Sequence, residues 1–360
     1  MEIKMKIFAN YMQRWRNFKD LDKKDKRRQL GEFAINNSLY FLLLVAIVYI
    51  GIVSPKFLSV PSLVNILSLS AASLPIALGI AGCIILTGTD LSAGRIVGLT
   101  ACVAASLLQS NSYANKMFPG LATLPVWAVL LIVIAIGALV GFVNGFCTAK
   151  FKLHPFIVTL ATQLIIYGVL LMYLMQGNNN GQARSGLDSR FNDFINGSIL
   201  SIGNTPIPNF VWYALIITVI MWFIWNKTKF GKNMFAVGSN AEAANVSGVN
   251  VTATIILVFT LAGIMYGITG FIESARISSN SAATGVNYEL DAIAACVIGG
   301  VSFVGGIGKI RGVILGVVLL RLIFVGLTFL SIDANLQYII KGLIILVACA
   351  IDMRKYLVRR

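Results

Sequence analysis

Few side chains in this sequence are of a type that performs chemistry, and those few are scattered. The single histidine, His154, is followed by Pro155, and the five cysteines lie far apart in apolar segments without a C-x-x-C pair. A metal centre, or a nucleophile with its base, requires such groups at short spacings or in a cluster. The pattern therefore argues against an enzyme or a metal site, and we expect the cysteines to be small apolar packing residues.

A phosphate-binding loop is also excluded. The stretch Gly305-Gly-Ile-Gly-Lys309 is followed by Ile310, where the nucleotide-binding motif requires Ser or Thr, and Phe303 stands at the position of its first glycine. We therefore expect this chain to bind no cofactor.

Two aspartates mark the starts of predicted helices, one in Gly88-Thr-Asp90-Leu-Ser-Ala-Gly94 and one in Glu289-Leu-Asp291-Ala-Ile. Asp at a helix start is a favoured cap, because its carboxylate accepts from free N–H groups at the positive end of the helix dipole. The alternative is that these breaks line a transport path or its gates. The candidate residues for the path are Thr87, Asp90, Ser92, Glu289, Asp291 and Ser302.

Two cations, Arg321 and Lys341, fall inside predicted membrane helices, where a charge is costly and often functional. We find no Asp or Glu near the centre of a predicted span that could pair with them. A proton-coupled relay therefore lacks its carboxylate, and we interpret both side chains as snorkelling or as structural pairing.

The composition indicates a membrane protein. Hydrophobic residues make up 57% of the 360 and charged residues only 12%, about half the charged fraction of a soluble domain. Ten apolar segments are candidates to cross the roughly 30 Å of a bilayer core. They are residues 34–53, 64–87, 93–108, 125–148, 156–175, 210–225, 252–272, 290–301, 312–330 and 336–351. The third and eighth are short, and such segments are tolerated only inside protein or beside a polar cavity.

The basic residues predict the topology. With the N-terminus in the cytoplasm, 22 of the 29 Lys and Arg lie on the cytoplasmic side, five outside and two within spans, as the positive-inside rule requires. Both termini are then cytoplasmic, and the net charge of +15 reflects topology and anionic lipid rather than nucleic acid. We divide the chain into a basic cytoplasmic segment (1–33), a membrane domain (34–352) and a basic cytoplasmic tail (353–360).

Ten spans divide into two sets of five. Because each set has an odd number of helices, the second set enters the membrane from the opposite side, so any repeat is inverted. We therefore predict an all-α polytopic fold with a possible inverted 5+5 repeat, in which the two Asp-bearing breaks occupy corresponding positions.

The longest internal cytoplasmic stretch, residues 226–251, has the pattern of a docking element. Ser239 and Glu242 form a capping box, alanines favour helix, and Gly248 supplies a stop. A short helix with a small-residue face is suited to docking in a partner's groove. The predicted docking residues are Ser239, Asn240, Ala241, Glu242, Ala243, Ala244, Asn245, Val246, Ser247 and Gly248.

Three motifs carry a family resemblance. The first is Thr228-x-Phe230-Gly231 followed by Gly238-x-Asn240-x-x-Ala243-Ala244-x-x-x-Gly248, the second is Gly88-Thr-Asp-Leu-Ser-Ala-Gly94, and the third is Tyr288-Glu-Leu-Asp-Ala-Ile-Ala-Ala295 with its glycine-rich continuation to Gly308. Together they resemble the permease subunits of bacterial ABC sugar importers, in the ribose/galactose/xylose branch. The resemblance covers roughly residues 39–356 and is strongest to the members that carry galactose or methyl galactoside, whereas the long basic N-terminus departs from it.

The resemblance implies the partners. It implies a homodimer in the bacterial inner membrane, with ATP and Mg²⁺ bound by a separate cytoplasmic ABC ATPase that engages residues 239–248, and a periplasmic sugar-binding protein outside. The outer loop 176–208, with Arg184, Asp188, Arg190 and Asp193, is a candidate docking surface for the binding protein. The cargo implied is galactose or methyl galactoside. The alternatives are ribose, xylose, a nucleoside or a signalling furanose on the same machinery, a proton-driven secondary sugar transporter, and a membrane-embedded enzyme.

Overall fold

The computed structural model describes residue 22 and residues 38–177 and 180–357. The chain forms two compact units, Met1–Tyr49 and Ile50–Arg360. The predicted basic segment 1–33 lies outside the described residues apart from Asp22, and the tail 353–360 is described only in its backbone, as far as residue 357.

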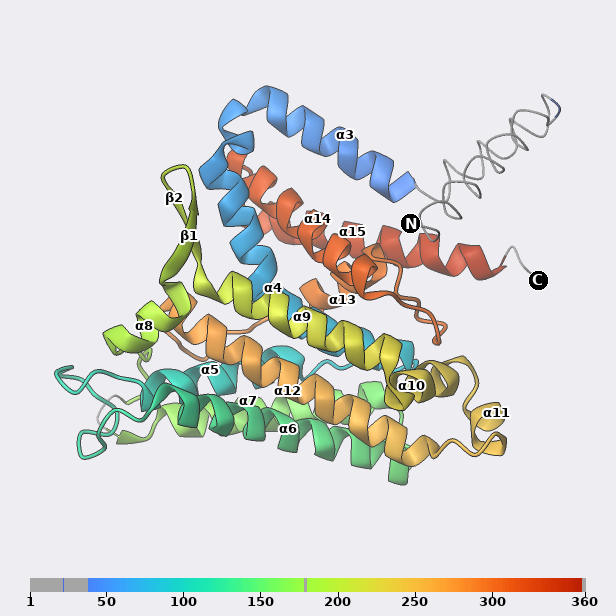
Figure 1. The fold of residues 1–360 in the computed structure, drawn as a ribbon, viewed down its shortest axis with the longest axis horizontal. Coiled ribbons are helices and arrows are strands. Elements are labelled where there is room, and N and C mark those ends of the chain that lie inside the picture. The colour runs from blue at the N-terminus through green and yellow to red at the C-terminus, as the bar shows by residue number, and fades with distance from the viewer. Residues whose placement is uncertain (1–21, 23–37, 178–179, 358–360) are drawn as a thin grey trace, which may run out of the picture. The chain divides into compact units, whose positions relative to one another are not determined.

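Thirteen α-helices form most of the described chain, and each of the ten predicted spans falls on one of them (Figure 1). Those ten are α3 (Ser38–Val53), α4 (Val60–Ile85), α5 (Ala93–Leu107), α6 (Val126–Lys150), α7 (Pro155–Leu174), α9 (Asn209–Lys227), α12 (Val251–Ile277), α13 (Tyr288–Ile298), α14 (Ile310–Phe329) and α15 (Ala334–Leu357). Among the described residues, six helices are long and apolar enough to cross a membrane: α4, α6, α7, α9, α12 and α14.

The prediction of an exclusively helical chain was incomplete. Residues 197–208 contain an antiparallel hairpin of β1 (Ser198–Ile202) and β2 (Thr205–Pro208), in which Ile202 pairs with Thr205. The two residues between the strands are Gly203 and Asn204, a short-loop signal that predicts a hairpin, and Gly203 has the positive φ of 59° that such a turn requires. The remaining elements are η1 (Pro55–Leu58), α8 (Ser189–Asn196), α10 (Lys229–Ser239) and α11 (Ala241–Val246).

Within the second unit, α4 and α12 form the centre of the helix bundle. In the most apolar stretch of α4, 78% of the residues are buried, and in that of α12, 61% are. The most apolar of the six candidate spans, α6, has only 22% of its stretch buried. Because lipid is the favourable environment for an exposed apolar face, we assign the outer face of α6 to the bilayer and α4 and α12 to the protein interior.

Two helices of this core touch through glycine. Gly137 of α6 lies directly against Gly263 of α12, so that a β-carbon built on either one would collide with the carbonyl oxygen of the other. Small residues at such a crossing allow two membrane helices to approach backbone to backbone. The contact fixes α6 on the central helix without a hydrophobic driving force.

The short helices α5 and α13 are both buried. They have 15 and 11 residues, which at about 1.5 Å per residue is well short of the roughly 30 Å of a bilayer core. As predicted for short segments, they are enclosed by longer helices. The short elements between the long helices of the second unit lie at its two ends. The helix α8 and the hairpin lie at one end, and α10 and α11 lie at the other (Figure 1).

Candidate functional site

The first group of predicted path residues belongs to a buried polar chain at the start of α5. Oδ1 of Asp90 accepts from the backbone N–H of Ser92 (2.9 Å) and from its hydroxyl (2.6 Å). The Ser92 hydroxyl also accepts from the amide of Asn144 (2.9 Å), whose oxygen accepts from the Thr162 hydroxyl (2.6 Å). Asp90, Ser92 and Asn144 are fully buried. The chain therefore ties α5, α6 and α7 together across a helix break.

The prediction that an Asp caps each helix start was wrong in its detail. The residue at the N-cap position of α5 is Ser92, two residues after Asp90, and that of α13 is Asn287, which has a positive φ of 63°. Asp90 still accepts from a backbone N–H at the helix start, whereas Asp291 lies inside the first turn of α13 and directs its carboxylate to other helices. The local sequence favours a cap, but long-range ion pairs decide the position of Asp291.

Glu289 brings two of the predicted motifs together. It is 5% exposed, and its carboxylate lies so close to Gly94 that a β-carbon there would collide with Oε2. The carboxylate of the α13 motif therefore sits on the first turn of α5. An acidic group at this end of a helix is stabilised by the helix dipole.

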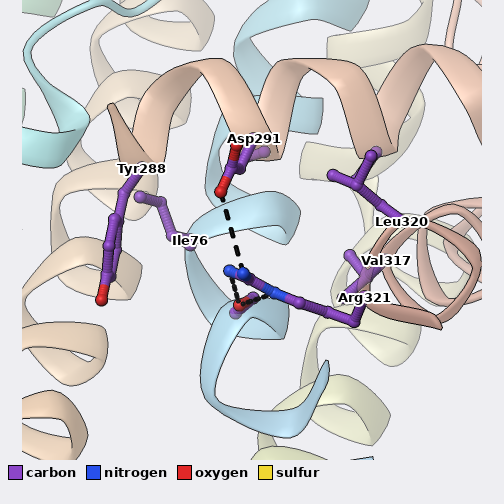
Figure 2. Close-up of a pocket in the computed structure, with 9 residues that line it drawn as sticks. Ile76, Tyr288, Asp291, Val317, Leu320 and Arg321 are labelled. Atoms are coloured by element: carbon purple, nitrogen blue, oxygen red, sulfur yellow. Dashed lines mark hydrogen bonds and ion pairs between the residues drawn. The ribbon is translucent and has the colours of Figure 1, made fainter. Parts of the chain in front are cut away.

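Asp291 is the centre of an ion cluster built from three helices. Oδ1 is 2.6 Å from Nζ of Lys341 on α15, and Oδ2 is 3.8 Å from the Arg321 guanidinium on α14. Arg321 also donates from Nε (3.0 Å) and Nη2 (2.5 Å) to the hydroxyl of Ser73 on α4. Figure 2 shows Arg321 pointing toward Asp291.

This cluster corrects the statement that the two intramembrane cations lack a carboxylate. Arg321 and Lys341 share Asp291, which the sequence places at the start of a short helix rather than near the centre of a long one. Because α13 begins inside the bundle, its first turn meets the middle of α14 and α15. The depth of a helix start is a tertiary property and is invisible in a hydropathy profile.

A second ion pair lies next to the start of α13. Arg276 donates from Nε (2.9 Å) and Nη2 (2.7 Å) to the carboxylate of Glu273, which also accepts from the Tyr288 hydroxyl (3.1 Å). Glu273 is 2% exposed. The two-point geometry is the strong form of an arginine–carboxylate pair. Sequence reasoning missed Glu273, Tyr288, Asn144 and Thr162, and the only available signal was polarity inside an apolar segment.

Thr87 and Ser302 lie at a junction of three segments. The junction joins the end of α4, the end of α10 and the glycine-rich loop 299–309. The N–H of Gly306 donates to the carbonyl of Ile85 (2.9 Å). A β-carbon at Gly238 would collide with that same carbonyl, and one at Gly305 would collide with Thr87. The backbone contact leaves no room for side chains, so the end of α10 packs directly on the end of α4.

The predicted docking helix exists, with a different cap. The side chain of Asn240 accepts from the N–H of Ala243 (2.9 Å), and Ser239 is the last residue of α10. The predicted capping box of Ser239 with Glu242 was therefore wrong by one position, because α10 continues to Ser239 and leaves Asn240 as the first extended residue.

The predicted stop at Gly248 is present. Its φ is 84°, its N–H donates to the carbonyl of Asn245 (2.9 Å), and the N–H of Val249 donates to the carbonyl of Ala244 (3.0 Å). This pair of bonds is the Schellman motif. The helix of six residues is thereby closed at both ends, which gives it a defined shape in the connection between α10 and α12.

The surface of α11 differs from the surface that we expected. Ala244 is 5% exposed and faces the chain itself, whereas Val246 is 90% exposed. The other residues of α11 are also exposed; they are Ala241, Glu242, Ala243 and Asn245. The exposed large apolar side chain of α11 is therefore Val246, and Ala244 is withdrawn from its surface.

The loop 176–208, which the sequence predicts to lie outside, contains a buried arginine. Arg184 is fully buried, and its guanidinium donates to the carbonyl of Leu174, while its backbone N–H donates to the carbonyl of Asn280 (2.6 Å). The carboxylate of Asp188 caps α8 by accepting from the N–H of Arg190 (2.9 Å). Arg184 thus holds the loop in place and is withdrawn from the candidate docking surface, whereas Arg190 and Asp193 are exposed.

In the described part of the chain, no three His, Cys, Asp or Glu side chains come together in a way that could hold a metal ion. The polar side chains described above instead form hydrogen bonds and ion pairs with one another.

Comparisons with known proteins identify relatives along almost the whole chain. Residues 62–349 match the family described as branched-chain amino acid transport system / permease component. The chain is 48% identical over 318 residues to the galactose/methyl galactoside import permease protein MglC of Escherichia coli (strain K12), covering 88% of this chain and 94% of that protein. The protein of the same name from Haemophilus influenzae is 45% identical over 320 residues (89% and 94%). The ribose import permease protein RbsC of Escherichia coli (strain K12) is 34% identical over 314 residues (87% and 92%). No solved structure matches.

Proposed function

Because this chain belongs to the family of permease components of branched-chain amino acid transport systems, we propose that it is the membrane-spanning subunit of an ABC importer that carries galactose or a methyl galactoside. It is a multi-pass protein of the inner membrane, with six long apolar helices among its described residues, and its relatives are named as transport permeases. The cargo is supported by 48% identity to a galactose/methyl galactoside import permease, against 34% to a ribose import permease.

The proposal includes ten spans in an inverted 5+5 arrangement with both termini in the cytoplasm. Reciprocal packing supports it. The long helix α4 contacts α13 and α14 of the second half, and the long helix α12 contacts α5 and α6 of the first half. In each half a long buried helix is followed by a short buried one and then by another long helix. An exchange of partners of this kind is expected where two halves related by a pseudo-two-fold axis interlock.

The proposed coupling element is α11 with the end of α10. The observation that carries this part of the proposal is the backbone contact of Gly238 with Ile85, because it transmits a displacement of α10 directly to α4. ATP and Mg²⁺ are bound by a separate ATPase that contacts α11, a sugar-loaded binding protein docks at the opposite end, and two copies of this chain form the channel. Closure of the ATPase would then move α10, α4 and the loop 299–309 together.

One rival mechanism, proton-driven transport, would use Asp291. A proton-driven sugar transporter requires a carboxylate inside the membrane domain, and Asp291 occupies such a position. It is paired with two cations rather than placed alone, which favours a structural or cargo-binding role. Transport measured with all ion gradients collapsed separates the two mechanisms.

The cargo is tested by ATP hydrolysis. The chain is reconstituted with its ATPase in liposomes, and purified sugar-binding protein is added with galactose, methyl galactoside, ribose or xylose. We expect galactose and methyl galactoside to stimulate hydrolysis several-fold over the sugar-free binding protein. Stimulation only by ribose or xylose would support the ABC importer mechanism and would show that the cargo is that sugar rather than galactose.

A further inference from the structure

The ion cluster at Asp291 separates two spaces of very different size. On one side is the pocket of Figure 2, which has a volume of about 10 Å³ and is lined by Ser73, Ile76 and Tyr288. This is room for at most one water molecule. On the other side is a cavity of about 240 Å³ that opens to the surface, where its lining residue Tyr338 is 60% exposed. Asp291 and Arg321 line both spaces, so the pair forms a polar partition between a roomy cavity and a constriction.

The larger cavity has hydrogen-bond donors and acceptors that its ion pairs do not occupy. Arg321 has five N–H donors, and two of its nitrogens bind Ser73 while the guanidinium stands 3.8 Å from Asp291. The amide nitrogen of Gln337 donates to the carbonyl of Ile332 (3.0 Å), which leaves the amide oxygen as an acceptor. A ligand with several hydroxyl groups, each both a donor and an acceptor, fits this set.

Aromatic rings complete the cavity. The Lys341 ammonium lies 4.8 Å from the ring centre of Phe324 and 5.5 Å from that of Tyr338, and both rings line the cavity. Rings of this kind pack against the C–H face of a sugar, while nearby polar groups bind its hydroxyls. Pockets for drug-sized ligands have volumes of about 300–1,000 Å³, so a cavity of about 240 Å³ suits a smaller ligand, of the size of a monosaccharide.

We propose that this cavity is a binding station for a neutral monosaccharide on its way through the protein, with Asp291, Arg321 and Gln337 binding hydroxyls and Tyr338 packing on the ring. The Asp291–Arg321 pair then closes the station on the side of the constriction, and the pair separates when the sugar passes. The assignment rests on the proposed sugar transport and adds the place where the sugar is held.

The direct test is protection of a cysteine by sugar. Gln337→Cys is made in the full chain with Cys147 and Cys349 changed to Ser, because these two are the half-exposed cysteines among the described residues. The chain is reconstituted with its ATPase and binding protein, and reaction with methyl methanethiosulfonate is followed over time. Galactose is expected to slow the reaction at least about 5-fold, and sorbitol is not.

The matched control is the neighbouring position. Leu336 lies on the same helix, is 48% exposed and does not line the cavity, so the reaction of Leu336→Cys should be unaffected by galactose. Equal rates with and without galactose at position 337, or equal protection at both positions, would overturn the assignment. Protection by galacturonate at a tenth of the effective galactose concentration would overturn the choice of a neutral sugar.

Transport distinguishes this inference from the proposed function. Tyr338→Ala should lower galactose uptake at least about 5-fold while hydrolysis of ATP stimulated by the binding protein persists, and Leu336→Ala should change neither. If Tyr338→Ala imports galactose normally and galactose does not protect Gln337→Cys, the binding station is refuted while the proposed function stands. Failure of the unmodified complex to import galactose refutes the proposed function itself.

Discussion

Some buried polar side chains in this protein are hydrogen-bonded across helices, and their positions show where specific bonds hold the bundle together. Asn144 is the clearest case, because its amide bridges Ser92 of the α5 start and Thr162 of α7. In an apolar interior a polar group that loses its partner costs free energy. The same residues that break the hydropathy pattern therefore fix the arrangement of α5, α6 and α7.

Asn144→Ala should destabilise the fold by about 1–3 kcal/mol, because it removes two hydrogen bonds and leaves Thr162 and Ser92 without this partner. The measurement is the midpoint of thermal unfolding of the purified protein in detergent. The control is Asn226→Ala, since the amide of Asn226 is exposed and bonds only to the carbonyl of Trp222. An equal loss in both variants would contradict a special role for the buried network.

Asp291→Asn should be more damaging, by about 3–5 kcal/mol, because it leaves Arg321 and Lys341 without their shared counter-ion. Lys341→Met in the Asp291→Asn background should restore part of the loss, since it removes one of the unpaired cations. Thermal unfolding of the two single variants and the double variant forms the cycle. Additive losses would show that the two side chains do not interact.

In the second unit, α6 and α12 touch backbone to backbone at Gly137 and Gly263, so neither position has room for a side chain. Gly263→Ala should lower stability by about 1–3 kcal/mol, because the new β-carbon meets the backbone of Gly137 and the two helices must separate. Gly168→Ala on α7 is the control, since no atom lies within 4 Å of its added carbon. Thermal unfolding that ranks the two variants in the reverse order would contradict the contact.

The coupling helix makes a separate prediction. Val246→Asp should weaken association with the ATPase at least about 10-fold, roughly 1.4 kcal/mol, because it places a charge on the exposed apolar residue of α11. Retention of the ATPase by the tagged chain during purification is the readout. Ile199→Asp, at the hairpin and 77% exposed, should leave retention unchanged. Undiminished retention by Val246→Asp would exclude α11 as the docking element.

The sequence predicts the helices well because hydropathy and length are local properties. All ten predicted spans fall on helices, and the stop at Gly248 is found as a left-handed residue. The pairing of Asp291 with Arg321 and Lys341 required knowledge of the depth of α13, and the burial of Arg184 required the path of the outer loop. Neither feature can be read from a short stretch of sequence. The residues of the candidate site were therefore predicted only in part.

At the scale of the whole molecule, the polar groups form separate stations rather than one active site. The buried chain at Asp90 joins α5, α6 and α7, whereas the ion cluster at Asp291 and the glycine junction near Thr87 both include residues of α4. The helices α5 and α13 contact each other, and α4 contacts α10, α13 and α14. A displacement at α10 therefore has a short physical route to the ion cluster, as an importer driven from its cytoplasmic end requires.

In the proposed importer, ATP hydrolysis in a partner subunit drives sugar through this chain. The direct measurement is uptake of labelled galactose into sealed vesicles containing this chain and its ATPase, with ion gradients collapsed, with and without ATP on the ATPase side and binding protein on the opposite side. We expect uptake only when both ATP and the binding protein are present. Uptake that needs an ion gradient and proceeds without ATP would contradict this expectation.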